Sequence, residues 1–268
     1  MINVGVVGNG YVGKATAFMA KGHNVKFHDS DESKSDCSLS ELAYSSDLIF
    51  ICVPTPMDED GSCCTDIVRA VAGSLRTSGV GSDKVVIRST VPMGTCNEFE
   101  SNFMPEFLTE KNWKQDVINC KEWVFGVHDK KNFNKSLIEE LVGGARIHYC
   151  TTQEAELCKY VRNCFLATKV SFFNEIHEFC EKSNLDYEKV KHLTLLDERI
   201  NSSHTQVPGP DGRKGFGGTC FPKDMSSLNH QMAEKEILSY IIASAISRNK
   251  NTDRPEQDWK KDKGRAVS

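Results

Sequence analysis

Short apolar runs alternate with stretches of helical periodicity through the first half of the chain. The apolar runs have the length of strands and occupy residues 2–8, 24–29, 47–54, 84–90 and 122–127. Helices are predicted between them at residues 11–22, 38–46 and 65–79. Strands and helices that alternate in this way are typical of a parallel sheet with helices on both faces. The pattern therefore predicts an α/β fold built on a doubly wound parallel sheet.

The pattern changes near residue 150. Residues 151–184 form one long helical pattern, with Thr151 or Thr152 as a candidate N-cap and Asn184 as a candidate stop. Much of this helix is apolar or small, through Leu157, Tyr160, Val161, Cys164, Phe165, Ala167, Thr168, Ser171 and Phe172. A helix with so much apolar surface is typically buried on two sides. We expect a homodimer through residues 153–183, with a purely intramolecular core helix as the alternative.

A long loop and a second helical stretch complete the chain. Residues 200–220 are rich in turn-forming residues, and residues 227–249 return to a helical pattern. The predicted organisation is a first domain over residues 1–149 and an all-helical domain over residues 150–250. Residues 251–268 are polar and are predicted to form a C-terminal tail or docking segment.

Composition and charge narrow the class of protein. The net charge of −4 and the pI near 6.1 argue against nucleic acid as a partner. The longest apolar runs, "LIFICV" and "ILSYIIA", are too short to cross a membrane. The eleven cysteines show no CxxC pair and no grouping with histidine, so no metal site is expected. The chain begins with a strand pattern rather than a secretion signal, so we expect a cytoplasmic protein whose cysteines are mostly reduced and buried.

Three glycines follow the first predicted strand in the spacing of a dinucleotide-binding turn. Gly8 allows the tight turn, Gly10 lets a pyrophosphate approach the backbone, and Gly13 lets the next helix pack closely on the sheet. Asp29 ends the second predicted strand, where a carboxylate can accept a hydrogen bond from a ribose 2′-hydroxyl. The acidic residues that follow would repel a 2′-phosphate. The sequence thus predicts a Rossmann-type domain that binds NAD rather than NADP, with a turn that binds no ligand as the alternative.

Cys220 lies in a setting that is unusual for a structural cysteine. The segment "GFGGTCFPKD" places glycines before it and Pro-Lys-Asp after it. Pro222 is favoured as the first residue of a helix, so Cys220 would directly precede a helix N-terminus, where a thiolate is stabilised. Lys223 adds nearby positive charge. The segment indicates a reactive thiol, with an inert buried cysteine as the alternative.

Six stretches in order give the chain a resemblance to a known family. They are "GNGYVG", "VPTP", "RSTVPMGT", "PEFLTE", "AELCKYVRNCFLATKVSFFNEI" and "GFGGTCFPKD". In these stretches the chain resembles the UDP-glucose/GDP-mannose dehydrogenase family of NAD-dependent nucleotide-sugar oxidoreductases. The resemblance implies a four-electron oxidation of a sugar CH2OH to a carboxylate, with UDP-glucose as the favoured nucleotide-sugar substrate, in the metabolism that supplies polysaccharide biosynthesis.

The chemistry of this oxidation gives Cys220 a specific role. A thiolate can hold the intermediate aldehyde as a thiohemiacetal, and loss of a second hydride then gives a thioester. Lys159 and Asn163 are four residues apart and therefore share one helix face. Burying a lysine and an amide on an apolar helix costs free energy, so such residues usually serve a function. The resemblance implies that they bind the reacting hydroxyl and stabilise the oxyanion. It also implies that Asp224 positions a water or assists as a general base. Glu106 would serve thioester hydrolysis, and Thr90 would help to hold the attacking water.

The resemblance extends to further binding residues. The cofactor-binding set that we expect consists of Gly8, Gly10, Tyr11, Val12, Gly13, Asp29, Lys34, Val53, Pro54, Thr55, Thr90, Glu110 and Lys223. The expected substrate-binding set consists of Phe107, Leu108, Lys159, Asn163, Arg199, Gly215 and Gly217.

Three departures from the family pattern keep other functions open. Met104 replaces the usual Asn before "PEFL", and Glu110-Lys111 replaces the usual Glu-Gly. The chain also shows no second Rossmann-like domain after Cys220, where the family binds the nucleotide of its substrate. The alternatives are a different or smaller sugar substrate, a β-hydroxyacid-type single hydride transfer, and a catalytically silent NAD-binding module.

Overall fold

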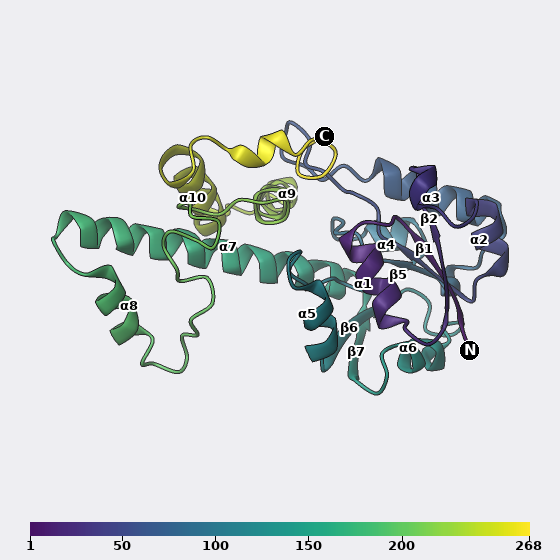
Figure 1. The fold of residues 1–268 in the computed structure, drawn as a ribbon. Helices are drawn as coiled ribbons and strands as arrows, with labels where there is room; N and C mark the ends of the chain where they lie inside the picture. The colour runs from purple at the N-terminus through teal and green to yellow at the C-terminus, as the bar shows by residue number, and fades with distance from the viewer. The chain divides into compact units, whose positions relative to one another are not determined.

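The computed structural model describes all residues from 1 to 268 and divides them into two compact units. Unit 1 comprises Met1–Thr55 and Thr65–Lys159, and unit 2 comprises Pro56–Cys64 and Tyr160–Ser268. Figure 1 shows a sheet with surrounding helices in the first unit and helices with long loops in the second. We describe each unit separately.

Unit 1 is built on a seven-stranded sheet in the order β2-β1-β3-β4-β5-β6-β7. Its strands are β1 (Asn3–Val7), β2 (Asn24–His28), β3 (Leu48–Ile51), β4 (Val85–Ile87), β5 (Asn102–Phe103), β6 (Glu122–Val127) and β7 (Arg146–Thr151). All neighbouring pairs are parallel except β5 and β6, which pair antiparallel through Phe103 and Gly126. The prediction of an α/β fold with a mostly parallel sheet is confirmed.

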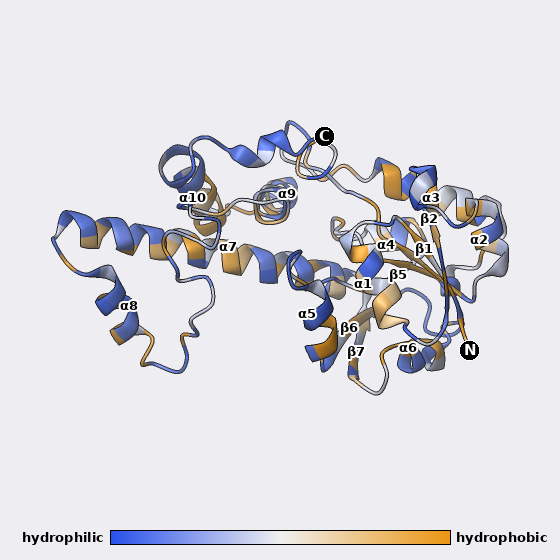
Figure 2. Cartoon of the chain, in the orientation of Figure 1, coloured by the Kyte–Doolittle hydropathy of each residue, from blue (hydrophilic) through white to orange (hydrophobic).

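The strands of this sheet are buried on both faces. The side chains of Val6 and Phe50 belong to one apolar cluster, whereas those of Val7, Ile49 and Ile51 belong to another. Side chains alternate between the faces of a strand, so two clusters require apolar residues at consecutive positions. Figure 2 shows hydrophobic residues concentrated in the strands of the sheet. Because these strands are buried on both faces, their sequences are continuous apolar runs.

Six helices accompany the sheet of unit 1. They are α1 (Tyr11–Met19), α2 (Leu39–Ser45), α3 (Asp66–Thr77), α4 (Thr95–Glu98), α5 (Trp113–Asn119) and α6 (Lys135–Leu141). Leu42 of α2 and Leu75 of α3 pack with one face of the sheet, and Val12 of α1 and Leu141 of α6 with the other. The three helices predicted between residues 11 and 79 are therefore present, and they pack on opposite faces of the sheet.

The long helix predicted after residue 150 is α7 (Thr152–Lys182). Thr151 caps it: its hydroxyl accepts from the Glu154 amide at 3.3 Å, and the Glu154 carboxylate accepts from the Thr151 amide at 2.8 Å. This reciprocal pair is a capping box. Past the other end, Asn184 adopts a positive φ of 54°. Of the two candidate caps, Thr151 is the one that is used.

The helices of unit 2 pack against two different sides of α7 (Figure 1). They are α8 (Tyr187–Thr194), α9 (Phe221–Glu234) and α10 (Tyr240–Arg248), followed by the short turns η3 (Asn249–Asp253) and η4 (Asp258–Lys261). Tyr160, Cys164 and Ala167 of α7 lie in one apolar cluster with Met225, Leu228 and Ala245. The single helical stretch predicted at residues 227–249 is two helices, because the backbone turns at Glu236 with a φ of 59°.

The C-terminal segment packs into unit 2. Trp259 and Ala266 are buried, and the Met57 amide donates to the Ala266 carbonyl at 3.0 Å. The Ser268 amide in turn donates to the Met57 carbonyl at 2.9 Å. Of the two sequence interpretations, the structure favours a docking segment. None of the helices combines the length and apolar character that crossing a membrane requires.

Candidate functional site

The predicted cofactor residues of unit 1 collect at one edge of the sheet. The glycine turn follows β1, Asp29 follows β2, Val53–Thr55 follows β3, and Thr90 lies shortly after β4. These four strands are adjacent and parallel, so their carboxyl ends lie side by side. In doubly wound sheets, ligands bind outside the carboxyl ends of the strands. The topology thus places these predicted residues along one continuous edge.

The glycine turn has the shape that a pyrophosphate needs. Gly8 has a φ of +98°, and a Cβ on Gly13 would lie 1.9 Å from the Gly8 carbonyl oxygen. A Cβ on Gly10 would meet nothing within 4 Å, so the space beside this backbone is open. Helix α1 begins at Tyr11, and its N-cap residue, Gly10, has no side chain that could cap the first turn. The N–H groups of the first turn point toward this space and can donate hydrogen bonds to an anion. This arrangement fits NAD, the cofactor predicted from the sequence.

Asp29 is held beside this turn as a carboxylate. Its two oxygens accept from the Asn9 amide at 2.7 Å and from the Asp31 amide at 3.0 Å. Burial alone would raise the pKa of Asp29, but these hydrogen bonds and the charge of Lys34 outweigh it and lower the pKa. The Lys34 carbonyl also accepts from the Asn9 side chain at 2.8 Å. The turn, Asp29 and Lys34 thus form one connected group.

The ends of β3 and β4 are joined by two side-chain hydrogen bonds. The Thr55 hydroxyl donates to the Thr90 carbonyl at 2.7 Å, and the Ser89 hydroxyl donates to the Val53 carbonyl at 2.6 Å. The structure therefore brings the predicted residues Val53, Thr55 and Thr90 together. Pro54 lies between the first two.

Lys159 and Glu106 form a buried pair in unit 1. The Lys159 ammonium donates to the backbone carbonyl of Glu106 and lies 3.3 Å from the Glu106 carboxylate. Each residue is only 4% exposed. Two opposite charges removed from water at this distance stabilise each other, whereas either one alone would be costly. The pair joins two residues that the sequence predicted for the same reaction.

Glu156 fixes the first turns of α7, from which Lys159 projects. Its carboxylate accepts from the backbone amides of Gly94 and Cys96 at 2.6 and 2.7 Å. Burial raises the pKa of Glu156, and these amide hydrogen bonds oppose the shift. The sequence analysis did not single out this residue. An acidic side chain three positions before Lys159 on an otherwise apolar helix was the available signal.

The two residues after Glu106 contact the Lys159–Glu106 pair. The Leu108 amide donates to the Glu106 carboxylate, and the Phe107 ring lies 5.8 Å from the Lys159 ammonium. Glu110 is exposed. Met104 is buried, and its sulfur lies 3.3 Å from the Arg88 guanidinium. The departure from Asn at position 104 therefore changes a buried contact rather than an exposed turn.

Unit 2 assembles a second group around the start of α9. Cys220 is the residue directly before the helix, as predicted, whereas Pro222 is its second residue rather than its first. Asp224 is 1% exposed and accepts from the Asn163 side chain at 2.6 Å and from the Lys223 ammonium at 2.6 Å. Burial disfavours the charge on Lys223, but the carboxylate of Asp224 and the ionised forms of Cys63 and Cys220 raise its pKa. Cys220 thus lies near a charged ammonium and at a helix start.

The remaining predicted residues of unit 2 divide into two cases. Gly215 and Gly217 lie in the loop before Cys220 and touch Asn249 and Arg254. Arg199 is elsewhere: its side chain bonds to Asp197, with the closest approach at 2.5 Å. The structure therefore does not bring Arg199 to the cysteine loop of its own unit.

The eleven cysteines divide by burial. All eleven are free thiols, and Cys52, Cys96, Cys164 and Cys180 are buried. Burial raises the pKa of Cys52 to about 11 and also raises the pKa of Cys96. The expectation of buried cysteines holds for these four, whereas the rest are half-buried. No group of side chains able to hold a metal ion is present.

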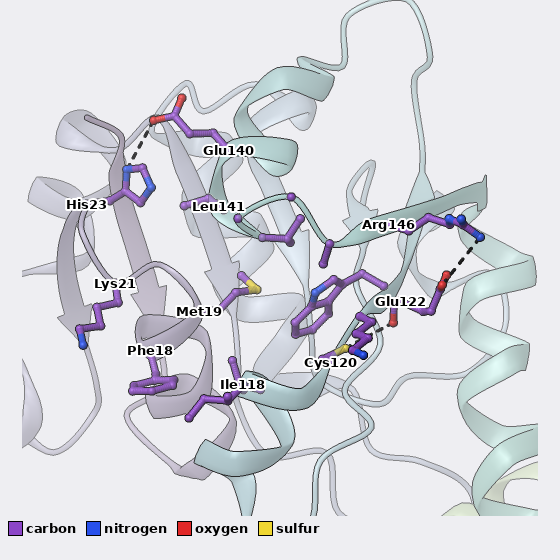
Figure 3. A pocket seen from close by; sticks show the side chains of 17 residues that line it. Phe18, Met19, Lys21, His23, Ile118, Cys120, Glu122, Glu140, Leu141 and Arg146 are labelled. Carbon is purple, nitrogen blue, oxygen red and sulfur yellow. Dashed lines mark hydrogen bonds and ion pairs between the residues drawn. The ribbon is translucent and has the colours of Figure 1, made fainter.

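An open pocket of about 730 Å³ lies in unit 1 away from these residues (Figure 3). Its lining includes Met19 at the end of α1, Ile118 of α5 and Leu141 of α6. Ion pairs join His23 to Glu140 and Arg146 to Glu122 at its rim, each at 3.8 Å. None of the predicted site residues lines it.

Comparisons with known proteins bear on this arrangement. The model for the NAD-binding domain of the UDP-glucose/GDP-mannose dehydrogenase family matches residues 35–143, and the model for the family's central domain matches residues 153–251. A UDP-glucose 6-dehydrogenase of Rickettsia prowazekii is 30% identical over 93% of this chain and 67% of its own length. The chain thus spans about two thirds of that relative.

Solved structures extend the likeness to the fold. The structure of a UDP-glucose dehydrogenase from Pyrobaculum islandicum has a TM-score of 0.82 and 26% identity, over 93% of this chain and 68% of that one. A 3-hydroxyisobutyrate dehydrogenase of Mycobacterium tuberculosis has a TM-score of 0.74 and 16% identity, over 92% of both chains. The second likeness concerns the fold alone.

Proposed function

The chain belongs to the UDP-glucose/GDP-mannose dehydrogenase family of NAD-dependent oxidoreductases, and on that premise we propose that it oxidises the CH2OH group of a nucleotide sugar to a carboxylate. The proposed substrate is UDP-glucose, the substrate in the printed names of several relatives. About one third of the length of those relatives lies outside the span that they share with this chain.

NAD supplies the acceptor for each of the two hydrides that the oxidation removes. In the proposal, the first-turn amides of α1 hold its pyrophosphate beside Gly10, where a Cβ would meet nothing. Asp29 accepts from the adenosine ribose. Val53–Thr55 and Thr90 border the rest of the cofactor along the ends of β3 and β4.

The reaction balances with one water and two molecules of NAD. The alcohol loses a proton and a hydride to give the aldehyde. The Cys220 sulfur then adds to the aldehyde carbon as a thiohemiacetal, and loss of a second proton and hydride leaves a thioester. Water cleaves the C–S bond, which releases the carboxylate and regenerates the thiol. The sum is RCH2OH + 2 NAD⁺ + H2O → RCOO⁻ + 2 NADH + 3 H⁺.

Buried charges give the remaining residues their proposed roles. Lys159 and Asn163 lie four residues apart on α7, so both side chains leave the same face of the helix. They hold the reacting oxygen and stabilise the negative charge that develops on it. Glu106 accepts a proton from the water that attacks the thioester, and Thr90 helps to hold this water.

The Asn163–Asp224–Lys223 network is the observation that carries the proposal. A dehydrogenase that transfers one hydride needs no thiol, whereas here a buried carboxylate with two charged or polar partners stands four residues after Cys220. Burying these charged groups costs free energy, which favours a role for them at the reacting centre. Asp224 orients Asn163 and Lys223, and Lys223 places positive charge near the Cys220 sulfur.

A covalent adduct on Cys220 tests the proposal. Glu106→Gln keeps the size of the side chain and removes the base for hydrolysis, so acyl-enzyme is expected to accumulate with NAD and UDP-glucose. Intact-mass and peptide measurements would place the added mass on Cys220. The double variant with Cys220→Ser is the control and should carry no adduct. An adduct on another residue, or none while NADH still forms, would refute the thioester route.

We also propose a homodimer through α7. Between the two faces that pack within unit 2, this helix exposes a row of apolar side chains at Val161, Phe165, Phe172 and Phe179. Their spacing of four and seven residues places them along one stripe of the helix. Phe165 and Phe172 are 66% and 56% exposed. A second copy of the chain would remove this apolar stripe from water.

A further inference from the structure

The segment after α10 pairs with the glycine loop that precedes Cys220. Asn249 is buried, and its side-chain oxygen accepts from the Phe216 amide at 2.8 Å. Its side-chain nitrogen donates to the Phe216 carbonyl at 2.9 Å. One amide side chain therefore satisfies both backbone groups of Phe216, much as a neighbouring strand would. The loop is fixed at this residue without belonging to any sheet.

Arg254 covers the same loop at Gly217. Its guanidinium is 3% exposed and is held by Asp258 at 2.6 and 2.8 Å and by Asp211 at 2.6 Å. A planar guanidinium bonded to two carboxylates has a fixed orientation. A Cβ on Gly217 would lie 2.4 Å from the Arg254 Cζ atom. The backbone of Gly217 thus rests directly on the guanidinium, and this contact explains the glycine.

Other contacts hold the loop from further sides. The Gly215 amide donates to the Asn174 side chain of α7 at 3.1 Å. Trp259 is buried and lines the same small cavity as Phe216 and Pro222. Only Gly218 and Thr219 separate Gly217 from Cys220. Fixing Gly217 on one side and Pro222 on the other therefore leaves the Cys220 backbone little freedom.

We propose that Asn249 and Arg254 are positioning residues for Cys220, and that they keep its sulfur where the reaction needs it. The inference rests on the proposed function of Cys220. The sequence places Asn249 at the end of the predicted helical stretch and Arg254 in the predicted polar tail, whereas in the structure both residues contact the loop that precedes Cys220.

Two variants and two matched controls test this inference in the full chain. Asn249→Ala removes both hydrogen bonds to the Phe216 backbone. Arg254→Lys keeps a positive charge but removes the planar guanidinium that contacts Gly217. Asn251→Ala is the first control, since Asn251 is exposed and bonds only to Ser247. Arg76→Lys is the second, because Arg76 lies on α3 in unit 1, is exposed and pairs with Glu100 at 2.8 Å, away from the loop.

The rate of amide hydrogen exchange in the loop measures how firmly Asn249 holds it, and this measurement does not depend on turnover. In Asn249→Ala, amide exchange in the peptide that contains Phe216 is expected to become at least about tenfold faster. Both controls should exchange like the parent. If Asn249→Ala does not fold, Asn249→Asp keeps the size and the acceptor and removes only the donor to the Phe216 carbonyl.

The kinetic constants kcat and KM test whether the Cys220 sulfur is correctly positioned. In Asn249→Ala and Arg254→Lys, kcat is expected to fall at least about tenfold, while KM for NAD stays within about twofold, because the predicted cofactor residues other than Lys223 lie in unit 1. If no sugar is turned over by the parent, the rate of Cys220 alkylation by iodoacetamide replaces kcat and is expected to change at least about threefold. Folded variants that exchange, turn over and alkylate like the controls would overturn the inference. Faster exchange with unchanged kcat or alkylation would overturn it as well.

Discussion

Two glycines three residues apart, Gly10 and Gly13, serve different purposes in the turn after β1. The space beside Gly10 is open, whereas a Cβ on Gly13 would collide with the Gly8 carbonyl. Gly10→Ala should therefore fold normally but weaken NAD binding by at least about tenfold, because the methyl group occupies the space into which the pyrophosphate fits. Calorimetric titration with NAD measures the effect.

Gly13→Ala is the matched comparison for this turn. We expect it to lower the thermal unfolding midpoint clearly, since the helix must move away from the turn. If Gly10→Ala and Gly13→Ala lowered the unfolding midpoint equally, this would contradict the view that Gly10 serves cofactor access and Gly13 serves helix packing.

Asp29 gives the second prediction at the scale of a residue. Asp29→Asn removes the charge but keeps the size of the side chain. Loss of a charge-assisted hydrogen bond, about 1.5–3 kcal/mol, should weaken NAD binding about 10- to 100-fold and reduce discrimination against NADP. Because the pKa of Asp29 is lowered, the carboxylate stays ionised to lower pH than an ordinary aspartate. NAD affinity of the parent should thus change little from pH 8 to about pH 5 on account of this group.

The exposed stripe of α7 carries the prediction at the scale of an element. Phe165→Glu together with Phe172→Glu should convert the proposed dimer into a monomer, since two charges per copy would have to be buried in the interface. Sedimentation velocity measures the change. Tyr44→Glu is the control, because Tyr44 is 96% exposed and lies on α2. A parent chain that sediments as a monomer at micromolar concentration would contradict the proposal.

The elements that the sequence predicted are those with strong and continuous patterns. Strands β1, β3 and β4 are buried on both faces and therefore stand out as apolar runs. Strand β5 has only two residues, and β7 is a half-buried edge strand whose sequence, "RIHYCT", is mixed. Neither gives a periodic signal. The break between α9 and α10 was missed because it depends on one backbone angle at Glu236.

The site residues that could be predicted from the sequence are likewise those with a strong local pattern. Lys159 and Asn163 were predictable because polar residues on an apolar helix are conspicuous. Their partners Glu106 and Asp224 are 53 and 61 residues away in the chain, and family motifs rather than spacing pointed to them. Asn249 and Arg254 carried no signal, because their role depends on a loop that folds back onto them.

At the scale of the whole molecule, the chain divides its predicted chemistry between two units. The residues that we assign to NAD, together with the Lys159–Glu106 pair, belong to unit 1, except for Lys223. Cys220, Asn163 and Asp224 belong to unit 2. The proposed oxidation assigns roles to residues of both sets. The central claim is therefore that a single sugar delivers two hydrides before it leaves.

The number of NADH molecules formed per sugar tests this claim most directly. Purified protein would be given excess NAD and a limiting amount of UDP-glucose, and in parallel GDP-mannose or UDP-N-acetylmannosamine, with absorbance followed to completion. We predict two NADH per sugar for the parent chain with one of these substrates. Cys220→Ser should stop at one NADH or fewer. One NADH per sugar in the parent, or two in Cys220→Ser, would contradict the proposed thioester mechanism.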